Sequence, residues 1–327
     1  MLNLQQQLQP VLKQHTGELI ARGIFQVLGG ANALPQADPS EALIHPDAHA
    51  RHTTRRLRVP VGGHTSPGYM FTPKEHLGAT VMLVHGTTAE KILPYYFYIR
   101  ALLRAGIQVM TFELDGHGAN PRPLCRLGLE DNVPSATQFL REQPGVDPDR
   151  IGMMGVSLGG ACIFNGAPKT GGIKAVATVS TPHSLGMSEM SKVLEALGTL
   201  NPEMLPTCLE ASPRMMLEFV TAPMRIAQTL EHAHEELDLL NPRMLEYMDE
   251  VIRHLNPLDN VRKLRNTPVL VVNGEWDNVT PPWQARDLYE RAPGPRHLAM
   301  IPRRNHFTIM GSTASINTVT NWFRKWL

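Results

Sequence analysis

Short apolar runs recur along this chain between stretches with helical spacing. The runs show little polar alternation, which is typical of parallel strands buried on both faces of a sheet. In chain order they are Ala79–Val84, Gln108–Leu114, Ile151–Met154, Ile173–Val179 and Pro268–Gly274. Helical patterns separate them, for example from about Pro94 to Ala105 and from about Asp131 to Arg141. This alternation predicts an α/β fold with a mostly parallel, doubly wound sheet.

Further elements precede and follow these runs. Two strand-like stretches, Arg56–Val61 and Ser66–Phe71, are joined through a glycine pair that permits a tight hairpin. Before them, residues 1–52 form an N-terminal extension whose apolar residues predict one or two helices, followed by a proline-containing loop. The chain closes with a helix, a strand and a helix, at about Pro282–Ala292, His297–Ile301 and Ser315–Leu327.

The α/β rhythm breaks at residues 184–258. This segment has no strand signal, and it contains three Asn-Pro or Ser-Pro pairs, at 201–202, 212–213 and 241–242. Each pair places a good N-cap residue before a proline at the first helical position, which predicts a helix start. We therefore expect a helical cap over residues 184–258, inserted late into an α/β core that comprises residues 53–183 and 259–327.

Composition narrows the classes of function. The chain has 327 residues, of which 42% are apolar and 19% charged, and its net charge of +1 gives no reason to expect nucleic acid as a partner. Three widely spaced cysteines without a CxxC pair make a disulfide scaffold or a zinc site unexpected. No apolar run approaches the length of a membrane span. We expect a cytoplasmic protein that acts on a small molecule without a metal or cofactor.

The stretch Gly155-Val156-Ser157-Leu158-Gly159 lies between a predicted strand and a small-residue segment that begins a helix. A serine on such a turn is held at the carboxyl end of a sheet, with helix N-terminal N–H groups beside its Oγ. This is a suitable place for a nucleophile. By itself, the motif also fits an ordinary glycine-rich turn between a strand and a helix.

Two further residues follow predicted strands at the same edge of the sheet. Asp277 comes just after the strand that ends near Gly274, and His306 comes just after the strand that ends near Ile301. Because the carboxyl ends of parallel strands lie along one edge, we expect both residues near Ser157. The chain order of serine, aspartate and histidine is the one found in α/β-hydrolases.

The chain resembles the α/β-hydrolase fold superfamily, specifically its capped serine esterase and peptidase branch, over about residues 53–327. The resemblance rests on motifs that all follow predicted strands: His85-Gly86, Asp115-Gly116-His117-Gly118, Gly155 to Gly159, Gly274 to Asp277, and His306. It implies a cap inserted between the sixth and seventh strands of the sheet. It also implies an oxyanion hole formed by the backbone N–H groups of Thr87 and Leu158.

The chemistry requires each member of this set. A serine hydroxyl is a poor nucleophile near neutral pH, so it needs a base such as histidine, whose pKa lies near that pH. We expect His306 to accept the proton of Ser157 and return it to the leaving group. Asp277 would fix the imidazole tautomer and stabilise the imidazolium. Glu275 is the rival acid, although its offset from the strand fits the family pattern less well.

Three other residues near these motifs have plainer interpretations. We expect His85 and His117 to be structural residues that shape the turns beside the site. Cys162 is interpreted as a small packed residue, because a serine already holds the nucleophile position.

Three functions stay open at this point. The first is a serine carboxylic-ester hydrolase that works through an acyl-enzyme on a small or apolar acyl substrate, and the second is a peptidase or thioesterase with the same triad. The third is a non-catalytic binding protein on the same fold. The stretch His85-Gly86-Thr87-Thr88 departs from the HGGG run of one lipase branch, which favours the broader group of capped esterases, thioesterases and peptidases.

The predicted cap is rich in methionine. Eight of the chain's 16 methionines lie in it: Met187, Met190, Met204, Met215, Met216, Met224, Met244 and Met248. Methionine adapts to irregular apolar shapes, so the cluster fits either ordinary helix packing or a pocket for an apolar acyl or alcohol group. The natural substrate and self-association through the N-terminal segment are left open by the sequence.

Overall fold

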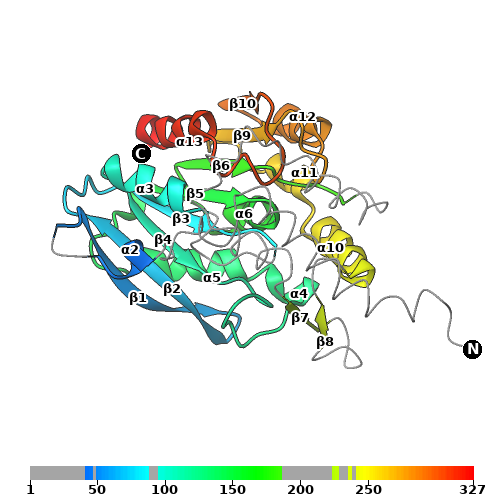
Figure 1. Cartoon of the computed structure of the whole chain (residues 1–327), viewed down its shortest axis with the longest axis horizontal. Coiled ribbons are helices and arrows are strands. Elements are labelled where there is room, and N and C mark those ends of the chain that lie inside the picture. Colours follow the sequence, from blue (N-terminus) through cyan, green and yellow to red (C-terminus); the bar gives the residue numbers. More distant parts are fainter. Residues whose placement is uncertain (1–40, 47–48, 88–94, 186–222, 228–234, 238–240) are drawn as a thin grey trace, which may run out of the picture.

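An eight-stranded sheet organises the protein (Figure 1). The computed structural model describes residues 41–46, 49–87, 95–185, 223–227, 235–237 and 241–327. In spatial order the strands are β1 (His52–Val61), β2 (His64–Pro73), β4 (Gln108–Phe112), β3 (Thr80–Val84), β5 (Ile151–Val156), β6 (Ala175–Val179), β9 (Val269–Gly274) and β10 (Arg296–Ile301). Every residue of β3, β4, β5, β6 and β9 is buried, which agrees with their nearly continuous apolar sequences.

The strands are mostly parallel, as the alternation of elements predicts. Strands β4, β3, β5, β6, β9 and β10 pair in parallel, whereas the β1–β2 hairpin is antiparallel and adds to β4. The chain moves outward from β3 to β4 and then returns to the other side of β3 to form β5. The loops after β3 and β5 therefore leave the sheet in opposite directions, a switch point where α/β proteins place their sites.

Helices cover both faces of the sheet. Helices α3 (Tyr96–Arg104) and α13 (Thr313–Trp326) pack on one face. Helices α5, α6, α11 and α12 cover the other, at Asn132–Arg141, Leu158–Thr170, Pro257–Val261 and Pro282–Arg291. Successive residues of β3 alternate between the two cores: Met82 and Val84 belong to the α6 side, and Val81 and Leu83 to the α3 side.

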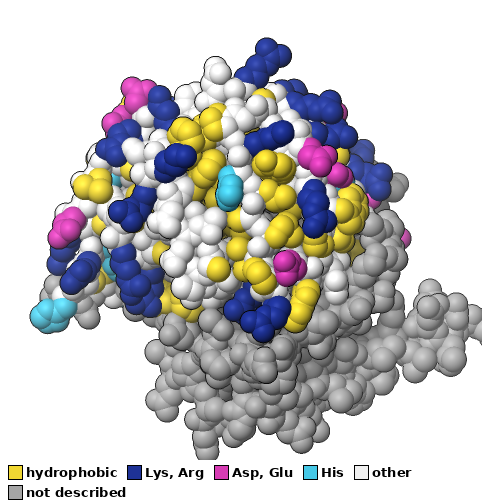
Figure 2. Space-filling view, turned by 90° about the horizontal axis from the view of Figure 1, so that it is seen from above, with side chains coloured by type: hydrophobic (Ala, Val, Ile, Leu, Met, Phe, Trp, Pro, Cys, Tyr) yellow, Lys and Arg dark blue, Asp and Glu magenta, His cyan; other side chains and the backbone are white. Residues whose placement is uncertain are grey.

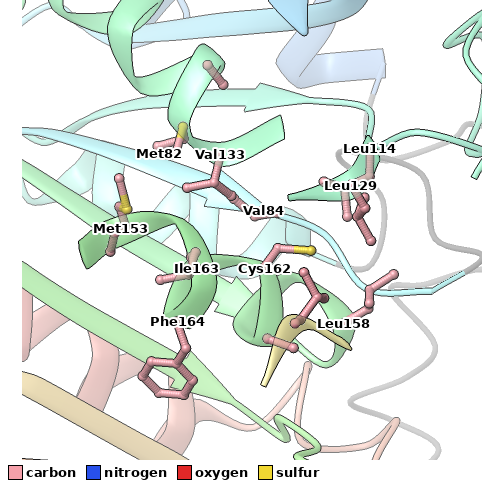
Figure 3. Packing of buried hydrophobic residues seen from close by; sticks show 14 of the residues in the cluster. Met82, Val84, Leu114, Leu129, Val133, Met153, Leu158, Cys162, Ile163 and Phe164 are labelled. Carbon is pink, nitrogen blue, oxygen red and sulfur yellow. The ribbon is translucent and has the colours of Figure 1, made fainter. Parts of the chain in front are cut away.

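Helix α6, which begins directly after Ser157, packs deep in the core (Figure 3). The figure shows it against α5 and β5, with the labelled side chains Val133, Met153, Leu158, Cys162, Ile163 and Phe164. Cys162 is 2% exposed, and burial raises the pKa of its thiol. It is therefore the packed residue that the sequence indicates, and α6 is a rigid base for the residue that precedes it.

The described part of the 184–258 insertion contains α10 (Pro242–Leu255) and a two-stranded ribbon, β7 (Met224–Ile226) with β8 (Glu235–Leu237). Helix α10 starts as predicted, because the Asn241 side chain accepts a hydrogen bond from the N–H of Arg243 at 3.0 Å. The expectation of a purely helical segment is wrong for the ribbon, since three-residue strands are too short to show alternation. The predicted helix starts at 201–202 and 212–213 lie outside the described residues.

Three of the eight cap methionines are described: Met224, Met244 and Met248. All three are at most 1% exposed and belong to the core cluster on the α6 side. In this part of the insertion, methionine therefore serves packing. The other five methionines lie outside the described residues, as do residues 1–40 of the N-terminal extension.

Three short helices were not predicted from the sequence: α2 (Glu41–Ile44), which falls in the expected proline-containing loop, α4 (Arg126–Leu129) and η3, a 3₁₀ turn at Pro148–Arg150. Such single turns carry no hydrophobic periodicity that a sequence pattern could reveal. Among the described residues, none of the helices has both the length and the apolar character needed to cross a bilayer. On the face over α12, α13 and β10, Lys and Arg side chains are scattered among apolar ones and form no stripe (Figure 2).

Candidate active site

Ser157 lies on a sharp turn between β5 and α6. Its φ of 50° and ψ of −121° fall in a region that residues with a side chain rarely adopt. Its N–H donates to the Val179 carbonyl at 2.9 Å, which anchors the turn to β6. Neighbouring backbone leaves no room for a side chain at Gly159, where a Cβ would lie 2.2 Å from the Val84 carbonyl oxygen. The sharp strand-to-helix turn predicted from the sequence is present, and the contacts around it hold the serine in this strained conformation at the sheet edge.

The structure brings His306 to this serine. The Nε2 atom of His306 lies 3.2 Å from Ser157 Oγ, and its Nδ1 atom lies 3.0 Å and 3.2 Å from the two carboxylate oxygens of Asp277. A carboxylate only accepts hydrogen bonds, so Nδ1 carries the proton and Nε2 is left as the acceptor for the serine hydroxyl. This is the tautomer that a general base requires.

Asp277 is held in a dense set of donors. It is 1% exposed, and its Oδ1 accepts from the N–H groups of Val279 at 3.0 Å and Thr280 at 2.7 Å. Its Oδ2 accepts from the Thr280 hydroxyl at 2.8 Å as well as from His306. These bonds offset the desolvation of the buried carboxylate and fix its orientation. The rival acid, Glu275, is exposed, and the carboxylate that contacts His306 is that of Asp277.

Close packing of two loops explains why Asp277 and His306 meet. Trp276, just before Asp277, donates its N–H to the Arg304 carbonyl at 3.0 Å. A Cβ at Gly274 would lie only 2.1 Å from that same oxygen, so glycine at this position lets the loop after β10 cross the end of β9. Asn305 then fixes the turn that carries His306, because its side chain accepts from the N–H groups at 307 and 308.

The predicted oxyanion donors belong to two segments next to Ser157: the start of α6 and the loop after β3. Leu158 is the first residue of α6, where helix geometry leaves N–H groups without an intrahelical acceptor. Thr87 follows Gly86, and a Cβ built on Gly86 would lie 3.1 Å from the Ser157 Cβ. The loop that carries Thr87 therefore passes directly beside the serine. The two N–H groups stay the predicted oxyanion donors, and the contact between Gly86 and Ser157 is the observation that bears on them.

His85 and His117 are buried, and their hydrogen bonds agree with structural roles. His85 Nε2 accepts from the Leu114 N–H at 2.9 Å, so its Nδ1 carries the proton and donates to the Gly86 carbonyl at 2.8 Å. His117 Nδ1 donates to the Asp115 carbonyl at 2.9 Å. Its ring packs edge-on against that of His85, with 4.9 Å between the two ring centroids. These bonds hold the turns after β3 and β4.

Opposite pKa shifts occur side by side in this buried cluster. Burial lowers the pKa of His117 to about 4. Burial also raises the pKa of Asp115 to about 6, although Asn132 and Arg122 counteract the rise. Relative to the unfolded chain, folding therefore favours the neutral form of each residue. Between pH 4 and 6 the two effects on stability have opposite signs, because folding releases a proton from His117 and takes one up at Asp115.

Replacing His117 with asparagine tests this balance. A depressed histidine pKa destabilises the folded state as pH falls from 6.5 towards 4, because only the unfolded chain takes up the proton. We therefore expect His117→Asn to become more stable relative to the wild type over this interval, by roughly 3 kcal/mol at 1.36 kcal/mol per pKa unit. Urea unfolding of both proteins at several pH values measures the difference. A difference that does not vary with pH would contradict the assignment.

Two supporting residues were not found from the sequence. Thr280 lies three residues after Asp277 and donates to its carboxylate through both its N–H and its hydroxyl. An aspartate followed closely by a threonine is typical of an Asx turn, so the sequence offered a signal for this contact. Tyr95, whose hydroxyl accepts the Gly86 N–H at 2.7 Å, had no sequence signal. Among the described residues, no group of three or more His, Cys, Asp or Glu side chains is placed to bind a metal ion.

Comparison with known proteins adds the family. A model of the hydrolase family described as serine aminopeptidase S33 matches residues 75–311, more than two thirds of the chain. The chain belongs to this family. All five predicted site residues, from Thr87 to His306, lie within the matched region of this S33 hydrolase.

Individual relatives of the S33 hydrolase are distant. Thiohydrolase aneE of Aspergillus aculeatus is 24% identical and covers 72% of this chain and 81% of its own length. A solved esterase structure from Pyrococcus furiosus has a TM-score of 0.60 at 14% identity, over 90% of this chain and 95% of that one. Carboxyl esterase 2 from Tuber melanosporum has a TM-score of 0.57 at 17% identity, over 86% and 88%. These likenesses show the α/β-hydrolase fold.

Proposed function

We propose that this S33-family protein is a serine hydrolase that cleaves a carboxylic ester of a small or apolar acyl substrate through an acyl-enzyme. The observation that carries the proposal is the continuous chain of contacts from Ser157 Oγ to His306 and on to Asp277, at 3.2 Å and 3.0 Å. These distances allow a proton to move from serine to histidine without rearrangement.

The proposed reaction begins with attack of Ser157 Oγ on the ester carbonyl carbon. His306 Nε2 takes the hydroxyl proton, and Asp277 stabilises the imidazolium that forms. The negative charge that develops on the carbonyl oxygen is bound by the N–H groups of Thr87 and Leu158, each of which contributes about 3 kcal/mol to lowering the barrier. His306 then returns the proton to the alcohol oxygen as the carbon–oxygen bond breaks.

A water molecule completes the cycle. It attacks the acyl-serine while His306 takes one of its protons. As the second tetrahedral intermediate collapses and the bond to Ser157 Oγ breaks, His306 gives that proton to Oγ, which releases the carboxylic acid and restores Ser157. The same machinery accepts thioesters and amides in principle, because the leaving group differs but the carbonyl chemistry is shared. A thioester is the second candidate substrate, since one curated relative is called a thiohydrolase.

A substrate panel tests the proposal. It comprises p-nitrophenyl esters from acetate to laurate, the matching acyl thioesters, and aminoacyl amides, since the family description names an aminopeptidase. We expect esters to give the highest kcat/KM, with a preference that depends on acyl chain length. A preference for amides would make the protein a peptidase, and a flat chain-length profile would count against an apolar acyl pocket. Absence of turnover on the whole panel would contradict hydrolysis.

A further inference from the structure

Two side chains hold the loop after β3 by hydrogen bonding to the backbone N–H and carbonyl of Gly86. Sheet pairing of β3 ends at Val84. Two residues later, the Gly86 N–H donates to the Tyr95 hydroxyl at 2.7 Å, and the Gly86 carbonyl accepts from His85 Nδ1 at 2.8 Å. The backbone orientation at Gly86 therefore depends on two particular side chains and not on a strand neighbour.

The orientation of Gly86 determines that of the next N–H group. A trans peptide unit is planar, so the Gly86 carbonyl and the Thr87 N–H point in opposite directions. A side chain that fixes the carbonyl consequently fixes the direction in which Thr87 presents its hydrogen. His85 acts on this peptide from one side, and Tyr95 holds the adjacent peptide through the Gly86 N–H.

Tyr95 is close to the nucleophile. A Cβ placed on Gly86 would lie 3.4 Å from the Tyr95 hydroxyl oxygen and 3.1 Å from the Ser157 Cβ. The tyrosine hydroxyl and the serine Cβ therefore both lie close to Gly86. A shift of the Gly86 backbone by a fraction of an ångström would change the distance from the Thr87 N–H to an oxyanion formed at Ser157.

The tyrosine itself is rigidly placed. Tyr95 directly precedes α3, is 1% exposed and belongs to the apolar cluster on the α3 side of the sheet. Burial raises the pKa of its hydroxyl, so the group stays neutral across the working range of an esterase. It thus offers the Gly86 N–H an acceptor of constant position and charge.

We propose that Tyr95 is a positioning residue for the oxyanion hole: its hydroxyl holds Gly86 so that the Thr87 N–H is aimed at the charge that develops on the substrate carbonyl. The inference rests on the proposed function, because it assigns Thr87 to that hole. The proton path from Ser157 to Asp277 runs through His306 and does not include Tyr95. The effect of Tyr95 therefore falls on the transition state and not on substrate binding.

Tyr95→Phe tests the proposal by removing only the hydroxyl. Losing an oxyanion donor outright costs about 100- to 1,000-fold in kcat, so a misdirected donor is expected to cost roughly 10- to 100-fold. KM should change by less than about threefold, because ground-state binding does not use the hole. The inhibition constant of a trifluoromethyl ketone, which forms an oxyanion on Ser157, should rise by the same factor as kcat/KM falls.

Tyr98→Phe is the matched control. Tyr98 lies on α3, is fully buried, and bonds the Ser315 hydroxyl at 2.7 Å on the side of α13. Deleting its hydroxyl removes a buried hydrogen bond of the same kind, so both variants should lose similar stability, measured as Tm. Only Tyr95→Phe should lose kcat. A kcat for Tyr95→Phe within twofold of the Tyr98→Phe value would overturn the proposal.

Two further measurements keep the outcomes separate. If Tyr95→Phe does not fold, site-specific p-aminophenylalanine at position 95 fills the same volume with a poorer acceptor, and the same loss of kcat is expected. Ser157→Ala is assayed in parallel on the best ester. Loss of activity in Ser157→Ala together with unchanged kcat in Tyr95→Phe would refute the positioning role alone, whereas full activity in Ser157→Ala would refute the proposed function itself.

Discussion

Ser157→Ala is expected to abolish ester hydrolysis, with a fall in kcat of at least about 10⁴-fold, because no other group can form the acyl-enzyme at this position. The substitution removes one oxygen atom and leaves the elbow in place. A fluorophosphonate probe measures the same event directly, since it bonds covalently to an activated serine. The wild type should be labelled and Ser157→Ala should not.

Cys162→Ala is the control for this experiment. Cys162 is a nucleophilic residue type on α6, close in sequence to the elbow, but it is buried and its thiol pKa is raised. Labelling of Cys162→Ala should equal that of the wild type after correction for any loss of folded protein. An unlabelled wild type, or a Ser157→Ala variant that is still labelled, would contradict Ser157 as the nucleophile.

Asp277→Asn is expected to lower kcat by about 10⁴-fold, an effect of the size seen when a triad aspartate is replaced. The hydrogen bonds specify why. Oδ1 accepts two backbone N–H groups, so the asparagine oxygen must take that place and its NH₂ group must take the place of Oδ2. The NH₂ then lies 3.0 Å from His306 Nδ1 and favours the tautomer with the proton on Nε2, which cannot accept from Ser157.

Glu275→Gln provides the matched comparison for Asp277→Asn. Glu275 precedes Asp277 by two residues and undergoes the same change of carboxylate to amide, but it is exposed. Its kcat should stay within about twofold of the wild type, because an exposed charge is screened by water. Ester kinetics of the two variants at one pH decide the matter. A larger loss in Glu275→Gln than in Asp277→Asn would reverse the assignment of the acid.

Family membership and site geometry answer different questions about this protein. The S33 match and the similar folds show which scaffold the chain adopts and that it belongs among hydrolases. A fold supports many reactions, so the bond that is cleaved has to be argued from the site. The contacts around Ser157, His306 and Asp277 support acyl chemistry at a serine, and the substrate panel separates esters from thioesters and amides.

The alternation of strands and helices, the mostly parallel sheet, and the shared sheet edge of Ser157, His306 and a carboxylate after β9 follow from the sequence alone. Buried parallel strands have continuous apolar sequences, and residues just beyond their carboxyl ends must share one edge of the sheet. This is why the sequence by itself groups Ser157, Asp277 and His306 at one edge of the sheet. The glycines of the elbow were likewise a sequence signal for a tight turn, and the structure gives the reason: the turn between β5 and α6 leaves no room for side chains at Gly155 and Gly159.

Other features depend on contacts between residues far apart in the chain, and only the tertiary structure decided them. Asp277 and Glu275 follow the same strand, and no local pattern indicates which carboxylate faces His306. The carboxylate is selected by the loop after β10, which crosses the end of β9 at Gly274. The β7–β8 ribbon is too short for a periodic signal. In the sequence, Tyr95 is an aromatic residue near a predicted helix start, with no sign of a role. Only the folded structure brings its hydroxyl to the Gly86 N–H, beside Ser157.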